Sequence, residues 1–183
     1  MYGFTFKIVI YIYWSVKLII LGIDPGLAIV GFGVIEKKPN GTISVIDYGV
    51  INTPKEENTA VRIAMVYDGI IELIDKYKPY AIALEELFYH TNQKTVISVA
   101  ESRGAILLAC VKNCGNMYEY TPLQIKQALT GQGRAEKQQV QYMVRLILNL
   151  KSIPKPDDAA DALAVAICHS QTNNLVTKTS NRI

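Results

Sequence analysis

The sequence predicts a single α/β domain built on a mixed sheet. Its 183 residues suit one domain, and with half of them hydrophobic and 19% charged the composition is globular rather than disordered. Strand-like alternation and helical spacing follow one another as three strands, a helix, a strand, a helix, a strand and further helices. The first three strands have short connections, which favour antiparallel neighbours. This order predicts a five-stranded mixed sheet, three antiparallel strands followed by parallel ones, flanked by helices.

Turn residues and the spacing of apolar side chains delimit the elements. Strands are predicted over 18–24, 28–36, 43–51, 80–87 and 117–120, and helices over 60–78, 93–112, 122–129, 135–149 and 157–169. The strand at 80–87 follows a helix, so we expect it to run parallel to one of the first three. The helix at 93–112 is apolar on nearly all sides, which indicates a subunit interface as well as a core contact.

The two ends of the chain differ from this domain. We assign residues 1–16 to an N-terminal extension of unknown role, 17–170 to the domain and 171–183 to a polar tail. The apolar run from Ile8 to Val16 is too short for a membrane span, so we expect no membrane association. Three cysteines without paired spacing argue against a secreted disulfide framework and predict a cytoplasmic protein.

Basic residues gather in the middle of the chain, although the formal net charge is only +3. Residues 91–150 hold seven Lys or Arg side chains against three Glu and no Asp, a local balance of +4. A basic stretch beside a group of acids is expected where a polyanion is held over a cationic metal site. Charge alone leaves a solvated helix surface as the alternative.

Two candidate site residues lie on predicted strands. Asp24 ends the first strand beside a Pro-Gly turn, and Glu85 lies in the apolar strand at 80–87. Side-chain alternation puts Glu85 and Glu86 on opposite faces, so only one of them can share a site with Asp24. A carboxylate in so apolar a strand is costly unless it is paired or bound to metal.

The last helix carries the other candidates. Asp158 and Asp161 are three residues apart, Asp157 and Asp161 are four apart, and spacing does not choose between these pairs. Taken singly, the strand and helix acids could be turn, solvent-exposed or cap residues. Their joint occurrence favours a site for Mg²⁺ or Mn²⁺, since hard oxygen ligands suit these ions. Two such ions can activate water for phosphodiester cleavage.

Short motifs follow one another in a specific order and spacing between Leu18 and His169. They are Gly-Ile-Asp24-Pro-Gly, Ala-Leu-Glu85-Glu-Leu-Phe88, Ser-Arg103-Gly104, Ile-Lys126-Gln, Gly131-Gln-Gly-Arg-Ala-Glu-Lys137-Gln-Gln-Val-Gln and Asp158-Ala-Ala-Asp161-Ala-Leu-Ala. Together they resemble the RuvC family of bacterial Holliday-junction resolvases. The resemblance implies a homodimeric endonuclease of the ribonuclease H-like fold that makes paired symmetric nicks in four-way DNA junctions. It also implies a branch-migration complex of the RuvA–RuvB type as a partner.

The same resemblance assigns roles to single residues. Its catalytic and metal-binding acids fall on Asp24, Glu85, Asp158 and Asp161, with two Mg²⁺ ions per site, replaceable by Mn²⁺, and Asp157 left as a helix cap. Asp24 would bridge the ions, while Asp158 would ligate one or orient the attacking water. Its DNA contacts fall on Phe88, Lys126, Arg134 and Lys137. An aromatic side chain such as Phe88 can wedge into a base pair at the branch point.

Two other hypotheses come from different classes of protein. A junction-binding module that no longer cuts would carry the same motifs, although the intact set of four acids favours an enzyme. An ATP-using protein of the actin-like fold would share the Asp24-Pro-Gly turn. That fold needs two such domains, and this chain has room for one.

Overall fold

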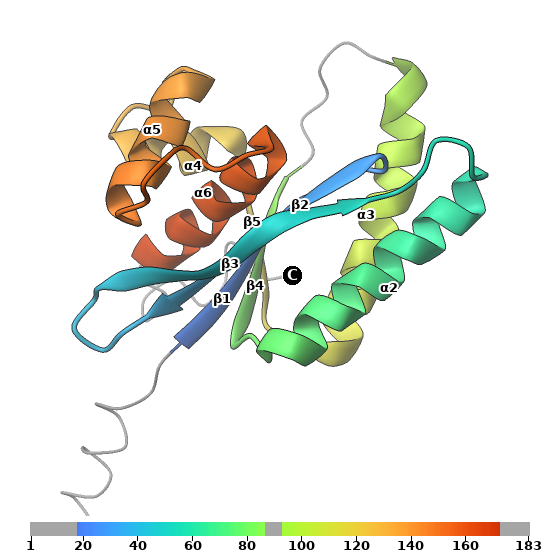
Figure 1. Ribbon diagram of the computed structural model, residues 1–183, viewed down its shortest axis with the longest axis horizontal. Helices are drawn as coiled ribbons and strands as arrows, with labels where there is room; N and C mark the ends of the chain where they lie inside the picture. Colours follow the sequence, from blue (N-terminus) through green and yellow to red (C-terminus); the bar gives the residue numbers. More distant parts are fainter. Residues whose placement is uncertain (1–17, 87–92, 173–183) are drawn as a thin grey trace, which may run out of the picture.

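The computed structural model describes residues 18–86 and 93–172, and there helices cover both faces of a five-stranded sheet (Figure 1). The strands are β1 (Leu18–Asp24), β2 (Ile29–Lys37), β3 (Ile43–Asn52), β4 (Ala81–Glu85) and β5 (Met117–Tyr120). They lie in the order β3-β2-β1-β4-β5. The first three strands are antiparallel, β4 runs parallel to β1, and β5 runs parallel to β4. The predicted mixed sheet and ribonuclease H-like fold class are confirmed.

Two layers of helices enclose this sheet. One layer holds α2 (Thr59–Tyr77) and α3 (Gln93–Asn113), and the other holds α4 (Pro122–Thr130), α5 (Lys137–Ile147) and α6 (Asp157–Gln171) (Figure 1). Alternation along β1 divides its side chains between the layers. Leu21 and Ile23 are buried with α2 and α3, whereas Ile20 is buried with α4, α5 and α6. Alternate residues of a strand therefore face opposite helix layers.

The predicted element bounds agree with the structure to within two residues wherever the chain is described. The extension at 1–16, the end of the predicted strand at Leu87 and the tail from residue 173 lie outside the described residues. Within 18–86 and 93–172, none of the helices combines the length and apolar character of a membrane span.

His169, near the end of α6, is buried rather than exposed. Only 5% of it is accessible, its Nδ1 lies 2.7 Å from the hydroxyl oxygen of Tyr120, and its ring packs on Tyr118. Burial, and then the charge of Lys37, lower the pKa of His169 to about 4, so the ring is neutral at pH 7. The ring is buried because β5 covers this end of α6.

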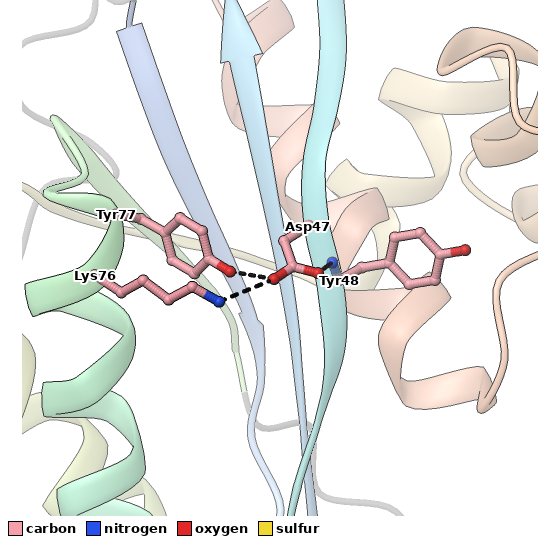
Figure 2. A network of polar contacts seen from close by, with 4 residues as sticks. All are labelled: Asp47, Tyr48, Lys76 and Tyr77. Atoms are coloured by element: carbon pink, nitrogen blue, oxygen red, sulfur yellow. Dashed lines mark hydrogen bonds and ion pairs between the residues drawn. The ribbon is translucent and has the colours of Figure 1, made fainter.

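A polar network anchors the C-terminal end of α2 to β3 (Figure 2). The Tyr77 hydroxyl donates to Asp47, whose other oxygen accepts the backbone N–H of Tyr48 at 2.9 Å, and Lys76 lies 3.4 Å from the same carboxylate. The hydrogen bond from Tyr77, together with those from Tyr48 and Lys76, lowers the pKa of Asp47. The network therefore holds a charged carboxylate against the edge of the α2 layer.

Candidate active site

Asp24 and Glu85 end two neighbouring parallel strands. Ile23 of β1 is paired with Leu84 of β4, so the residues that follow them lie side by side. Both carboxylates are on the α6 face of the sheet by alternation, whereas Glu86 is exposed. Glu85 is thus the acid that shares a face with Asp24, and this choice was open in the sequence.

The first turn of α6 lies directly above Asp24, because glycines face the helix. A Cβ atom on Gly31 would lie 2.1 Å from the carbonyl oxygen of Asp158, and one on Gly22 would lie 2.1 Å from that of Ala162. Gly31 is also the residue paired with Asp24 across β1 and β2. This close packing brings Asp158 and Asp161 to the carboxylates of the sheet.

Gly31→Ala is expected to push the first turn of α6 away from the sheet. The clashing atoms belong to the helix backbone and cannot rotate aside, so overpacking should cost roughly 1–3 kcal/mol of unfolding free energy. Urea unfolding measures this cost. Gly104→Ala is the matched control, since a Cβ there meets nothing within 4 Å. Equal stability of the two variants would contradict the close approach of α6.

The four predicted acids lie close enough to shift one another's protonation. Burial, and then the charges of Glu85, Asp161 and Asp158, raise the pKa of Asp24 well above its ordinary value. Burial and the charge of Asp161 raise the pKa of Glu85 to about 7, and burial raises the pKa of Asp161. Carboxylates crowded in this way are stabilised by a bound cation or a proton.

Three basic residues predicted to contact DNA lie near this cluster or in the loop beside it. Lys137, the first residue of α5, has its Nζ atom 2.9 Å from Asp161. The charge of Lys126 on α4 lowers the pKa of Glu85, so this lysine also faces the cluster. Arg134 is exposed in the loop between α4 and α5, and Phe88 lies outside the described residues. The lysines therefore contact the acids directly or act on them through their charge.

Asp157 does not cap α6, in contrast to what the resemblance implies. Pro156 holds the N-cap position without a side-chain cap bond, and Asp157 is the first helical residue. Its carboxylate lies 2.7 Å from Lys155 Nζ and 3.7 Å from Lys137 Nζ. Spacing had left Asp157 and Asp158 equivalent, because both lie within one helical turn of Asp161.

Gln141 is a further polar residue beside the site that the sequence did not single out. It lies one turn after Lys137 on α5, is 6% exposed, and contributes to lowering the pKa of Asp157. The sequence did offer one signal for it: a glutamine directly after Val140, a residue on the apolar face of an amphipathic helix.

The donor chemistry of the cluster suits a hard divalent cation. In the two described segments, no three His, Cys, Asp or Glu side chains already converge as a formed metal cluster. Asp24 and the three carboxylates that act on it nevertheless supply only oxygen donors, and the positive charge they attract comes from Lys137. The residues present therefore fit Mg²⁺ or Mn²⁺ rather than zinc.

Known proteins match this chain over the whole described fold. The model of the family crossover junction endodeoxyribonuclease RuvC matches residues 20–169. The RuvC protein of Clostridioides difficile is 54% identical over 158 residues, covering 86% of this chain and 93% of its own length. The Thermus thermophilus RuvC structure has a TM-score of 0.79 and 34% identity, covering 91% of this chain and 100% of its own. The T. thermophilus RuvC complex with a Holliday junction substrate gives 0.78 and 30% with the same coverage. The chain therefore belongs to the RuvC family of crossover junction endodeoxyribonucleases.

Proposed function

We propose that this protein resolves four-way DNA junctions by making paired symmetric nicks. The observation that carries the proposal is the gathering of Asp24, Glu85, Asp158 and Asp161 at one end of the sheet. Its relative from T. thermophilus was solved in complex with a Holliday junction substrate, and this chain covers all of that protein. The catalytic assignment of the four acids is part of the proposal.

We further propose that the four carboxylates hold two Mg²⁺ ions, which Mn²⁺ can replace. When bound, such ions supply a nucleophilic water and stabilise the leaving oxygen. The charges of Glu85, Asp158 and Asp161 all act on Asp24, so it would serve as a ligand common to both ions. Asp158 would either join as a ligand or orient the attacking water, and the products would carry 5′-phosphate ends.

Basic side chains around the acids would hold the DNA backbone. Lys126 and Lys137 lie close enough to lower the pKa of Glu85, so they are placed to neutralise phosphates near the scissile bond. Exposed Arg134 would contact the backbone further out. Phe88, just beyond the end of β4, keeps its proposed role as a wedge at the branch point.

Cleavage of a mobile four-way junction against linear duplex of the same length tests the activity. We expect 5′-phosphate nicks at symmetric positions in the junction with Mg²⁺ or Mn²⁺, and no cleavage in EDTA. Tight junction binding without cleavage under any cation would instead support the binding-module alternative.

The exposed side of α3 supports a homodimer. Ser102, Ile106 and Cys110 are buried against the domain, but Leu108 is 49% exposed and Val111 is 58% exposed. The sequence had indicated that the apolar helix is buried on two sides, and in this chain the second side is open. Pairing with the same helix of a second copy would cover it and place two active sites for symmetric cutting.

Leu108→Glu is therefore expected to give a monomer at micromolar concentration without unfolding the domain, because the new charge faces solvent in the monomer. Sedimentation velocity measures the change. Leu146→Glu on α5 is the matched control, since Leu146 is also 49% exposed and lies on the opposite layer. A dimer that persists in Leu108→Glu but dissociates in Leu146→Glu would place the interface on α5 instead.

We also propose a cytoplasmic location and a partner complex. Cys110, Cys114 and Cys168 are all free thiols, as suits a reducing cytoplasm. A branch-migration complex of the RuvA–RuvB type would deliver the junction. If such a complex also stimulated cleavage of a junction whose branch point cannot migrate, moving the branch point would not be its contribution.

A further inference from the structure

Lys137 lies between an acid of the proposed metal site and an acid outside it. Its Nζ atom is 2.9 Å from Asp161 and 3.7 Å from Asp157, one helical turn earlier on α6. Asp161 is one of the charges that act on Asp24, together with Glu85 and Asp158. The ammonium group therefore has one partner inside the carboxylate cluster and a second at its rim.

The two partners differ in their surroundings. The Asp161 side chain is 25% exposed, whereas that of Asp157 is 44% exposed and also pairs with Lys155 at 2.7 Å. The amide nitrogen of buried Gln141 has no hydrogen-bond partner among the described residues, yet it lies near enough to act on Asp157. Asp157 is thus a hydrated carboxylate with polar neighbours. In the metal-free protein it therefore competes less well than Asp161 for the ammonium group of Lys137.

We propose that Lys137 is a displaceable cation, which neutralises Asp161 before a divalent metal binds and then moves to Asp157, where it stays beside the scissile phosphate. This inference rests on the proposed metal-dependent function. A divalent ion at Asp161 would take the same carboxylate oxygens and repel the ammonium group. The flexible four-carbon stem of lysine lets the group cross the short distance to Asp157 by rotation.

Asp157 is accordingly a positioning residue for Lys137. Without it, a displaced ammonium group would have no acid on α6 outside the proposed metal ligands and would remain a stronger competitor for Asp161. With it, metal binding moves Lys137 without losing it from the site. The free energies of metal binding at Asp161 and of the Lys137–Asp157 pair are then coupled.

Mn²⁺ binding to the full-length protein without DNA tests this coupling, measured by electron paramagnetic resonance of free Mn²⁺. We expect Lys137→Gln to bind Mn²⁺ about two- to fivefold more tightly than wild type, as befits removal of a partly exposed ion pair. Lys126→Gln is the matched control: it removes a charge that also acts on Glu85, and no ion pair of Lys126 appears in the described part of the chain. It should change the affinity less.

Asp157→Asn completes a double-mutant cycle. We expect it to weaken Mn²⁺ binding when Lys137 is present and to weaken it clearly less in the Lys137→Gln background. The reason is that Asp157 affects metal binding only by pairing with the displaced lysine. Additive effects of the two substitutions would overturn the proposal, as would equal affinities of Lys137→Gln and Lys126→Gln. If wild type binds no Mn²⁺ at all, the metal-dependent function fails as well, and junction binding without cleavage would identify that case.

Discussion

Asp24→Asn is expected to reduce junction cleavage by at least about 10³-fold, while junction binding stays intact. Asp24 is the acid whose pKa is raised by the charges of all three others, so its loss would remove a ligand common to the proposed ions. A thousandfold change corresponds to about 4 kcal/mol of transition-state stabilisation, which is the size of a metal contribution. Single-turnover cleavage and a gel-shift assay in Ca²⁺ measure the two quantities separately.

The same substitution should make the metal-free protein more stable at pH 8. The native carboxylate is buried and faces three others, whereas the amide carries no charge to desolvate. Asp68→Asn on the exposed side of α2 is a control that should change neither cleavage nor stability. Cleavage by Asp24→Asn at the wild-type rate would refute the proposed chemistry, whatever its stability.

Short-range patterns were enough to predict the sheet and to place candidate acids at the ends of two strands. Alternation put Glu85 and Glu86 on opposite faces without choosing between them, and a parallel pairing was expected from the helix between the strands. The choice of Asp158 over Asp157 came from the family resemblance. What alternation could not supply is the distance between layers. That distance depends on Gly22 and Gly31, whose missing side chains let the backbone of α6 approach, and no local pattern announces such a contact.

Two residues of α6 show what position along one helix does not reveal. Asp157 was expected from the family resemblance to cap α6, and the burial of His169 could not be read from its place near the end of the helix. Asp157 instead contacts Lys137 of α5, and His169 bonds to Tyr120 of β5, so each is explained by a neighbour distant in sequence. Helix position constrains which face a residue presents, but tertiary packing decides what lies opposite it.

The metal-free protein is expected to lose stability as the pH rises from about 4.5 to about 7. Burial, and then the charge of Asp161, raise the pKa of Glu85 from 4.5 to about 7. In that interval the folded protein keeps a proton that the unfolded chain releases, so the stabilisation is complete below pH 4.5 and lost above pH 7. The difference between the two pKa values corresponds to at most roughly 3 kcal/mol.

Glu85→Gln separates this contribution from those of other acids. The amide cannot release a proton, so the variant should lose less stability across this interval and be the more stable protein in EDTA at pH 8. Adding Mg²⁺ at pH 8 should stabilise wild type, because the cation replaces the missing proton, and should stabilise the variant less. Urea unfolding at several pH values, with EDTA and with Mg²⁺, measures all four cases. An unchanged pH slope in Glu85→Gln would mean that Glu85 is ionised and paired in the folded protein. That result would contradict the proposed crowding of the four carboxylates, on which the metal site depends.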